Sequence, residues 1–398
     1  MRTLPEKKQR ESVEIADIFR LHGEAYCKAN TLTPEQYKVV HAIKNCRTSV
    51  LGGHVEQCEQ CSATSCAYNS CRNRHCPKCE TFRAVKWLEA RKAELLPVPY
   101  FHVVFTLPHE LNNLVQYNKR LLYKLLFQAA WETLDKLGSD PQRLDGKMGA
   151  LSILHTWGQN LSQHNHVHFI VPGGALKKSG KWKSAKKYLF PVKVLSKLFR
   201  GLYVTKLREA YQKQQLELPD QLTAGLTSMA FDLLLDKLMA KDWVVYAKPP
   251  FASPEKLLHY LGRYTHKIAI SNHRILACDE HSVTFKWRDY AEDNKVKIMT
   301  LTPHEFIRRF LSHVVPHGFM RIRAFGFLGN ACKAKKVKAI QTMLNYKPSN
   351  PVKNPDIATL ILELTGKDIR ICPLCKKGQL KRISEIPSQL DGVKFDTS

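Results

Sequence analysis

The segment 46–80 constrains the fold more than any other part of this 398-residue chain. It holds two Cys-x2-Cys pairs, Cys58 with Cys61 and Cys76 with Cys79, separated by 14 residues. The segment is too short and too polar to carry an apolar core. Four thiolates on two such turns make the tetrahedral site that Zn²⁺ prefers, and the spacing is close to that of a four-cysteine ribbon. We therefore predict one structural zinc held by these four cysteines.

Other cysteine and histidine side chains crowd the same segment. They allow a second zinc site, as an alternative to simple burial, with the candidate ligands Cys46, His54, Cys71 and His75. A third pair, Cys372 and Cys375, has no obvious partner pair; it either completes a site with distant ligands or is a remnant half-ribbon. Because the nearby Arg72, Arg74 and Lys78 are cationic, we expect the zinc module to shape a DNA-contacting surface.

The chain is strongly basic, with 62 Lys and Arg against 35 Asp and Glu and a net charge of +27. Such an excess favours a polyanionic partner, most simply nucleic acid, over the alternative of a solvated basic surface. We find no apolar run of transmembrane length and no signal-peptide core at the N-terminus. We expect a bacterial, cytoplasmic, nucleoid-associated protein without membrane contact, whose reduced cysteines bind metal or are buried.

The pattern of elements predicts an α+β fold in five parts. Strands are expected at 100–107, 151–157, 166–172, 243–248, 273–278, 282–288 and 295–301, and long helices separate those before 250. Helices are expected in 11–45 and over 81–96, 112–137, 186–213, 226–240 and 254–269, and from Thr302. The predicted parts are a helical segment 1–45, a zinc-binding domain 46–96, a catalytic domain 97–272, a β/α DNA-binding extension 273–345 and a basic tail 346–398, loose beyond about 384.

The triplet His166-Val167-His168 predicts a metal site on a strand. Strand side chains alternate, so both imidazoles point to one face. If the preceding turn centres near 161–162, His155 lies opposite His168 and shares that face. Three imidazoles from two strands leave metal positions open for phosphate oxygens, as Lewis-acid chemistry on a phosphodiester requires. His164 is a fourth candidate in the predicted turn, and the alternative is that these histidines are structural or exposed.

Two tyrosines, Tyr260 and Tyr264, are one helical turn apart on the predicted helix 254–269 and share its side. Tyrosine is a weak nucleophile with a pKa near 10, so it needs a polarised target and nearby positive charge. Arg263 and Lys267 each follow a tyrosine by three residues and are candidates to stabilise the developing charge. The product would be a 5′-phosphotyrosine and a free 3′-hydroxyl. The alternative is that the tyrosines pack against the sheet.

With these motifs the chain resembles the two-tyrosine HUH rolling-circle transposases of the insertion-sequence ninety-one type, over nearly its whole length. The motifs that carry the resemblance are Ser70–Cys79, Phe105-Thr-Leu-Pro108, His166-Val-His168, Tyr260–Ser271, Phe306–Phe310 and Gly318–Arg323. It implies an HUH endonuclease domain, with an antiparallel central sheet flanked by helices, after a small helical and zinc-ribbon domain. It also implies cleavage and joining of single-stranded DNA at element ends and target, with Mg²⁺ or Mn²⁺ as catalytic cofactor and Zn²⁺ as structural metal.

Basic residues interleaved with aromatic ones are candidate DNA contacts, because single strands bind through phosphate pairing and base stacking. The candidates are Lys177, Lys178, Lys181, Arg308, Arg309, Arg321 and Arg323. No fused helicase is visible, so host helicase or replication machinery is an expected partner. Two alternatives are a plasmid replication initiator or relaxase of the same chemistry and a non-catalytic, zinc-dependent DNA-binding regulator. The regulator leaves the histidine and tyrosine arrangement unexplained.

Overall fold

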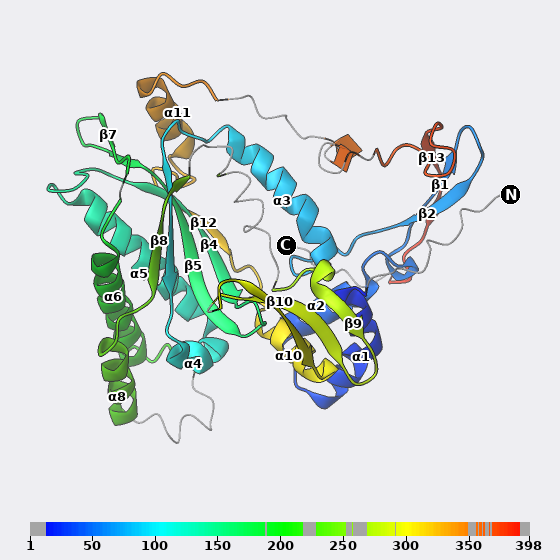
Figure 1. Ribbon diagram of the computed structural model, residues 1–398, viewed down its shortest axis with the longest axis horizontal. Coiled ribbons are helices and arrows are strands. Elements are labelled where there is room, and N and C mark those ends of the chain that lie inside the picture. The colour runs from blue at the N-terminus through cyan, green and yellow to red at the C-terminus, as the bar shows by residue number, and fades with distance from the viewer. Residues whose placement is uncertain are drawn as a thin grey trace.

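A five-stranded antiparallel sheet forms the centre of the computed structural model (Figure 1). The structure describes residues 13–187, 189–217, 228–251, 257, 269–290, 292–348, 356, 358–359, 361–362, 366 and 368–390. The strand order is β12-β4-β5-β3-β8. Their bounds are Tyr100–Thr106 for β3, Gly149–Trp157 for β4, Gln163–Pro172 for β5, Val245–Phe251 for β8 and Ile322–Gly326 for β12. The predicted α+β class with an antiparallel sheet flanked by helices is confirmed.

Alternation along β5 assigns its side chains to two buried layers. Val167, Phe169 and Val171 point to one face, and His166 and His168 point to the other. Both faces are covered, so the strand is buried nearly throughout rather than on alternate residues. Histidines on a covered face are enclosed by the fold rather than left on its surface.

Four helices cover the valine and phenylalanine face, on the left of the sheet in Figure 1. They are α4 (Asn112–Tyr117), α5 (Lys119–Ser139), α6 (Val192–Gln212) and α8 (Ser228–Met239). Phe105 of β3 meets Phe199 of α6 with ring centroids 5.0 Å apart, within the largest buried cluster of the described residues. This layer of helices supports the sheet on the face opposite the histidines.

The histidine face is covered by α3 (Pro77–Lys92), to the right of the sheet in Figure 1, and by α11 (Lys333–Met343), near its upper end. Ile153 and Ile170 of the sheet share a buried cluster with Ile340 of α11 and with Leu257. Leu257 is the only described residue of the predicted helix 254–269 before Ala269. The rest of that prediction lies outside the described residues.

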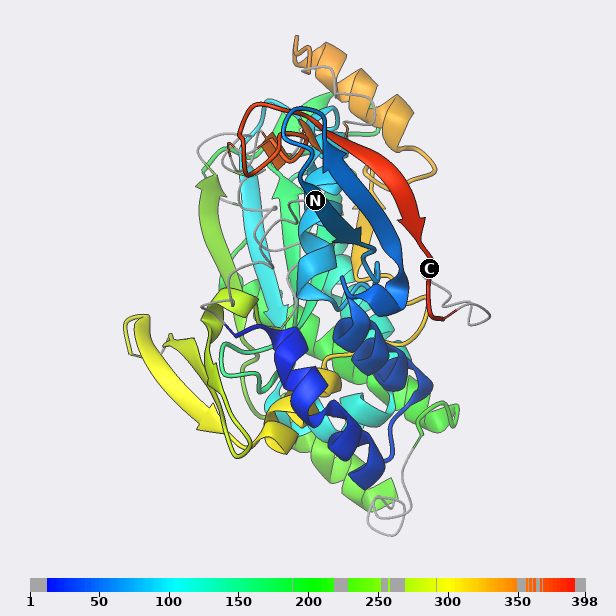
Figure 2. The same ribbon diagram turned by 90° about the vertical axis from the view of Figure 1, so that its right-hand side faces the viewer.

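The first two helices pack against a later part of the chain. Helices α1 (Ile15–Ala29) and α2 (Pro34–Asn45) lie beside the hairpin strands and α10 in both views (Figures 1 and 2). The start of α2 is as predicted: the Thr33 hydroxyl accepts from the Gln36 amide, and Pro34 occupies the first turn. Phe19 meets Phe310 edge to face at 5.4 Å. The later elements are β9 (Ile275–Cys278), β10 (Val283–Asp289), β11 (Lys295–Leu301) and α10 (Pro303–Ser312).

The C-terminal segment joins the zinc-binding region. Strand β13 (Leu380–Ile386) pairs with β1 (Gly53–Cys58), which pairs with β2 (Thr64–Tyr68), and Figure 2 shows the red strand alongside the blue ones. The expectation of a loose tail beyond about 384 is wrong as far as Ile386, because that residue pairs with Gly53. Such backbone pairing is invisible to local sequence patterns.

Strand β12 crosses a predicted domain boundary. It comes from the expected extension 273–345, yet it pairs with β4 and forms an edge of the central sheet. The short hairpin of β6 (Gly174–Leu176) and β7 (Trp182–Ser184) follows β5, and single 3-10 turns occur at Ser49–Leu51, His109–Leu111 and Asn272–Arg274. No helix among the described residues is long and apolar enough to cross a membrane.

Candidate active site and cysteine clusters

His155, His166 and His168 come together on one face of the central sheet. Their ring nitrogens all lie within 4.8 Å of one another. The three side chains are buried, with exposed fractions of 5%, 9% and 7%. This is the compact, enclosed set of imidazoles that the sequence predicted, and its donor atoms suit a divalent metal.

The strand register differs from the prediction by two residues. His155 lies opposite His166, and His168 lies opposite Ile153. The turn therefore centres one residue earlier than expected, with the Gly158 amide donating to the Ser162 carbonyl. A two-residue shift keeps every side chain on its face because the strand period is two. The predicted facial cluster survives an incorrect register for this reason.

Hydrogen bonds fix the orientation of the rings. Nδ1 of His166 is 2.6 Å from the carbonyl oxygen of His164, so this nitrogen carries the proton and Nε2 keeps its lone pair. The His164 side chain itself is exposed and is not in the ligand cluster. Nε2 of His168 is 3.0 Å from Nδ1 of His155.

His102 of β3 is a functional candidate that the sequence reasoning missed. Its Nε2 is 2.7 Å from Nδ1 of His168, and the two ring planes are within 7° of parallel. His102 shares the face of His168 because β3 is the neighbour of β5 in the sheet. The signal was a histidine inside an otherwise apolar strand, but only the strand order shows which histidine it meets.

Burial keeps these imidazoles neutral. Loss of solvent lowers the pKa of His166 and of His168 well below the ordinary value, and His168 and His155 respectively add to the effect. Burial also lowers the pKa of His102 to about 4. Neutral imidazole is the form in which histidine can bind a metal ion.

The predicted nucleophiles Tyr260 and Tyr264, with Arg263 and Lys267, lie outside the described residues. Leu257, three residues before Tyr260, is 1% exposed. It belongs to the buried cluster of Ile153 and Ile170, whose side chains share the face of the histidines.

The structure divides the cysteines differently from the prediction. Cys76 and Cys79 join Cys46 and Cys71, with Sγ distances to Cys79 of 3.7 Å from Cys46 and 3.6 Å from Cys71. The neighbouring sulfurs raise the pKa of Cys71 far above that of a free thiol, so these four cannot all ionise without a cation between them. Three of the four are buried in the core shared by α1, α2 and α10.

Cys58 and Cys61 form a separate cluster with Cys372 and Cys375. The Sγ atoms of Cys58 and Cys375 are 3.6 Å apart, and those of Cys61 and Cys372 are 3.8 Å apart. The predicted single site of Cys58, Cys61, Cys76 and Cys79 is therefore wrong in its grouping. The pairing of β13 with β1 places the distant knuckle beside the first one, so sequence spacing misidentified the partners.

The predicted second set is correct for Cys46 and Cys71 and wrong for its histidines. Nε2 of His54 lies 3.1 Å from a carboxylate oxygen of Glu56, its near neighbour on β1. His75 is buried, and its Nε2 accepts a hydrogen bond of 3.5 Å from the Val315 amide. Both rings are thus outside the cysteine clusters.

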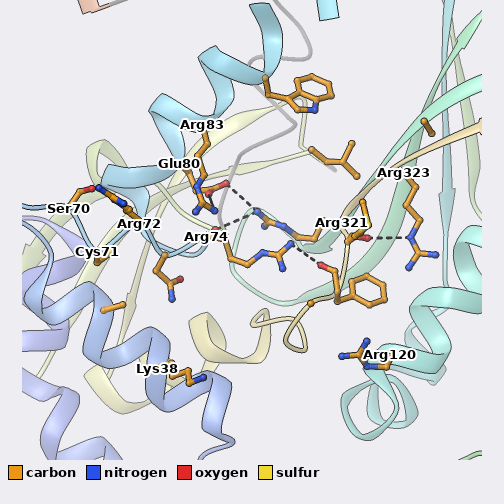
Figure 3. Close-up of a pocket in the computed structure, with 18 of the residues that line it drawn as sticks. Lys38, Ser70, Cys71, Arg72, Arg74, Glu80, Arg83, Arg120, Arg321 and Arg323 are labelled. Atoms are coloured by element: carbon orange, nitrogen blue, oxygen red, sulfur yellow. Dashed lines mark hydrogen bonds and ion pairs between the residues drawn. The ribbon is translucent and has the colours of Figure 1, made fainter. Parts of the chain in front are cut away.

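A basic cleft of about 1280 Å³ lies between the zinc-binding region and strand β12 (Figure 3). Nine cationic side chains line it, and Glu80 is its single carboxylate. They come from α2, the loop before α3, α3 itself, α5 and β12, and they are Lys38, Arg72, Arg74, Arg83, Arg91, Arg120, Lys124, Arg321 and Arg323.

The predicted DNA contacts fall into three groups. Lys178 and Lys181 are exposed near the β6–β7 hairpin, where Lys177 pairs with Asp145 at 2.8 Å. Arg308 and Arg309 bind Glu305 of their own helix: Nε of Arg308 lies 2.6 Å from Oε2, and Nε of Arg309 lies 2.6 Å from Oε1. The last two, Arg321 and Arg323, line the cleft.

Comparison with known proteins places the chain in a family. Residues 149–336 match the family described as "Putative transposase", and residues 18–107 match the transposase zinc-binding domain. "Putative transposase y4qJ" of Sinorhizobium fredii (strain NBRC 101917 / NGR234) is 46% identical over 93% of this chain and 95% of that protein. The chain belongs to the insertion-sequence ninety-one family of transposases.

A second relative extends the comparison. The transposase for insertion sequence element IS801 of Pseudomonas savastanoi pv. phaseolicola is 28% identical over 85% of this chain and 82% of that protein. The matched segment 149–336 contains the three clustered histidines, and the zinc-binding match contains six of the eight clustered cysteines. This transposase is thus an enzyme acting on DNA, with a zinc-binding domain before its central sheet.

Proposed function

We propose that this transposase nicks and rejoins single-stranded DNA at the ends of its element through 5′-phosphotyrosine intermediates. The observation that carries the proposal is the cluster of His155, His166 and His168 on one face of the sheet. These three imidazoles would hold a divalent cation, for which we propose Mg²⁺ or Mn²⁺. Such an ion would supply Lewis-acid polarisation of the scissile phosphate.

His102 and the His164 backbone act as positioning groups for the histidine cluster. The His164 carbonyl holds the proton on Nδ1 of His166 and leaves Nε2 free to bind a cation. His102 accepts the Nδ1 proton of His168 in the same way, which leaves the His168 Nε2 lone pair directed at the cluster. The tautomers of His166 and His168 are therefore selected by their hydrogen bonds.

The nucleophiles we propose are Tyr260 and Tyr264. The phenol oxygen attacks phosphorus, the bond to the 3′ oxygen breaks, and that oxygen takes a proton to become a free 3′-hydroxyl. The 5′ end stays on the tyrosine as a phosphodiester, so the bond energy is conserved for rejoining. Arg263 and Lys267 stabilise the developing charge. The burial of Leu257 on the histidine face supports this assignment, since Tyr260 follows it by only three residues in the sequence.

Two tyrosines allow two strands to be held in succession, which suits exchange between donor and target. The substrate we propose is single-stranded DNA, opened by host helicase or replication machinery. Plasmid replication initiators and relaxases would use the same chemistry, but the match of residues 149–336 to a transposase family favours transposition.

The test is formation of a covalent adduct. Purified protein is incubated with Mn²⁺ and labelled single-stranded DNA from the ends of its own element, then denatured and resolved by electrophoresis. We expect an adduct that disappears in the double variant Tyr260→Phe, Tyr264→Phe. Tyr117→Phe is the matched control, because Tyr117 is an exposed tyrosine that is not one of the proposed nucleophiles.

Loss of the adduct with retained DNA binding would support the phosphotyrosine mechanism. An unchanged adduct in the double variant would assign the nucleophile elsewhere. Specific binding with no adduct from the wild-type protein would instead favour a zinc-dependent DNA-binding regulator.

A further inference from the structure

The basic cleft brings together parts of the chain that are far apart in sequence. Figure 3 shows Lys38 of α2, Arg83 of α3 and Arg120 of α5 around a common space. Arg321 and Arg323 of the segment that forms β12 complete its wall. The zinc-binding domain forms one side and the central sheet forms the other, so the cleft exists only when both are folded together.

Cations in the cleft outnumber the carboxylates available to them. Glu80 is buried and accepts from Arg321 at 3.3 Å, while Arg83 lies 3.7 Å from its other oxygen. Arg74 binds the Phe319 carbonyl at 2.8 Å, and burial together with Arg321 lowers its pKa to about 10. The positive charges of these arginines repel one another, and Glu80 offsets them only in part. Binding of an added anion would lower this repulsion.

Further cations line the cleft at more exposed positions. Lys38, Arg72, Arg120 and Lys124 are exposed, and none forms an ion pair with a carboxylate in the part of the chain that the structure describes. Such a spaced set of cations suits a nucleic-acid backbone, because each phosphate that a cation neutralises releases condensed counterions.

The lining of the cleft also includes apolar and aromatic side chains. Leu151 and Trp87 are half-buried, and Phe319 is buried in the core. The Arg323 guanidinium lies 5.0 Å from the Phe319 ring centroid and 4.3 Å from that of Phe127. Unpaired bases stack on such surfaces, whereas a duplex keeps its base faces inside.

Strand β4 contributes residues both to the cleft and to the histidine cluster. Leu151 lines it, and His155 lies four residues further along the same strand on the same face. At about 3.3 Å per residue the separation is roughly 13 Å along the strand. DNA in the cleft is therefore continuous in direction with DNA at the proposed cleavage point.

We infer that this cleft binds the single-stranded DNA segment next to the cleavage point, and that the zinc-binding domain and β12 both contact this DNA strand. The inference rests on the proposed function, because it assigns the course of that substrate. The volume of the cleft, about 1280 Å³, exceeds the roughly 300–1,000 Å³ of small-molecule pockets, as binding of several nucleotides requires.

The test uses the triple variant Arg72→Gln, Arg120→Gln, Lys124→Gln, all at exposed positions; Arg120 also donates a hydrogen bond to the His317 carbonyl, so circular dichroism checks the fold of the variant. Binding of a long single-stranded oligonucleotide is measured over a range of salt concentrations. We expect affinity to fall on the order of tenfold or more at low salt. The slope of log K against log salt should shrink by about 2, since three contacts each contribute roughly 0.7.

The matched control is Lys197→Gln, Arg208→Gln, Lys237→Gln, which removes the same charge from exposed positions of α6 and α8. Equal affinity and slope in the two triple variants would overturn the inference, as would a cleft that prefers duplex competitor over single strand. Adduct formation by the wild-type protein reports separately on the proposed function. If the cleft substitutions weaken DNA binding but the wild-type protein forms no adduct, the proposed cleavage is refuted and the proposed binding site is retained.

An independent observation concerns the cluster of Cys58, Cys61, Cys372 and Cys375. Zn–S bonds of about 2.3 Å place the sulfurs of a tetrahedral site about 3.8 Å apart. The two Sγ distances across this cluster are 3.6 Å and 3.8 Å. A disulfide needs about 2.05 Å, so the four sulfurs surround a metal-sized space instead. The Gly378 amide donates to Cys375 Sγ at 3.3 Å, as in a metal-binding knuckle.

The geometry points to a second structural Zn²⁺ at this cluster, which joins the C-terminal segment to the N-terminal zinc-binding domain. Two of its ligands lie outside the matched zinc-binding region 18–107. The site closes a loop of more than three hundred residues and reinforces the pairing of β13 with β1. The zinc-binding domain is thus completed by residues from the other end of the described chain.

Metal counting tests this assignment. We expect two zinc ions per chain by mass spectrometry of the purified protein, and one after Cys372→Ser with Cys375→Ser. The control pair Cys66→Ser with Cys332→Ser lies outside both clusters and should retain two. A single zinc in the wild-type protein that survives the Cys372 and Cys375 changes would refute the second site. The wild-type count needs no variant, so a folding defect in the variant does not remove the test.

Discussion

The histidine cluster and the second cysteine cluster, formed by Cys58, Cys61, Cys372 and Cys375, both bring potential metal ligands together. They differ in how far apart those ligands are in the sequence. His155 and His166 lie opposite one another across a short hairpin. Cys61 and Cys372 meet at 3.8 Å although 311 positions separate them. A local hairpin constrains its side chains through strand alternation alone, whereas a long-range site depends on which strands pair. The contrast explains why one prediction succeeded and the other grouped its ligands wrongly.

The two sites also differ in what surrounds them. The histidines lie between buried layers of a rigid sheet, so their geometry exists without any metal. The second cysteine cluster lies in a small three-stranded sheet near the surface, with Cys61 exposed. Metal there supplies folding free energy, because such a module lacks a core of its own. In our proposals the first site serves chemistry and the second holds the chain together.

The largest expected effect comes from removing a proposed catalytic ligand. His166→Ala should reduce covalent adduct formation with Mn²⁺ by about 1,000-fold, since Lewis-acid stabilisation is worth several kcal/mol and each 1.36 kcal/mol is tenfold in rate. The rate is measured in single-turnover gels, and circular dichroism checks the fold. His281→Ala at an exposed position is the control. A loss below tenfold would show that the histidine cluster is not the catalytic metal site.

A second change compares the two cysteine clusters. Cys79→Ser should lower the free energy of unfolding by roughly 3–5 kcal/mol, because Cys79 belongs to the buried core shared by α1, α2 and α10. Cys61→Ser should lower it less, since that side chain is exposed at the edge of its cluster. Urea denaturation with a tryptophan signal measures both, against Cys66→Ser. The reverse order would contradict the assignment of the core role to the first cluster.

Replacing His102 tests its role as a positioning residue. His102→Ala should weaken Mn²⁺ binding by about 10–100-fold, the usual cost of losing a partner that orients a metal-binding histidine. Calorimetric titration of Mn²⁺ measures this apart from catalysis. His102→Gln keeps a hydrogen-bonding side chain and should recover part of the affinity. Equal affinity in all three proteins would assign His102 to packing alone.

The smallest effect is a pH dependence of stability. Burial lowers the pKa of His102 to about 4, while an unfolded histidine titrates near 6.5. Between these values the unfolded chain binds the extra proton, so the free energy of unfolding falls as pH decreases through that window. His102 contributes up to about 1.4 kcal/mol per pH unit there, and none below about pH 4. Urea denaturation between pH 7 and 5 should therefore show a shallower slope for His102→Gln. Identical slopes would mean that His102 is solvated.

Particular residues show how far the sequence could lead. Thr33 and Pro34 predicted the start of α2, because capping is a contact between near neighbours. The positions of His166 and His168 predicted a shared face, because side chains alternate along a strand. His102 remained unnoticed, because its meeting with His168 depends on the order of strands in the sheet. The cleft was only partly foreseen: Arg321 and Arg323 were candidates for DNA contact, but their convergence with Arg120 requires the folded chain.

The sequence by itself determined the chemistry available to this transposase: a neutral histidine pair on a strand, Cys-x2-Cys turns, a strongly basic surface and the family motifs. These are local patterns, and local geometry follows from backbone period and side-chain type. The tertiary structure alone decided which groups meet. It placed His102 behind His168, joined Cys58 and Cys61 to Cys372 and Cys375, and enclosed the cleft between two parts of the chain. Long-range strand pairing and burial make these choices, and neither leaves a signature within a short stretch of residues.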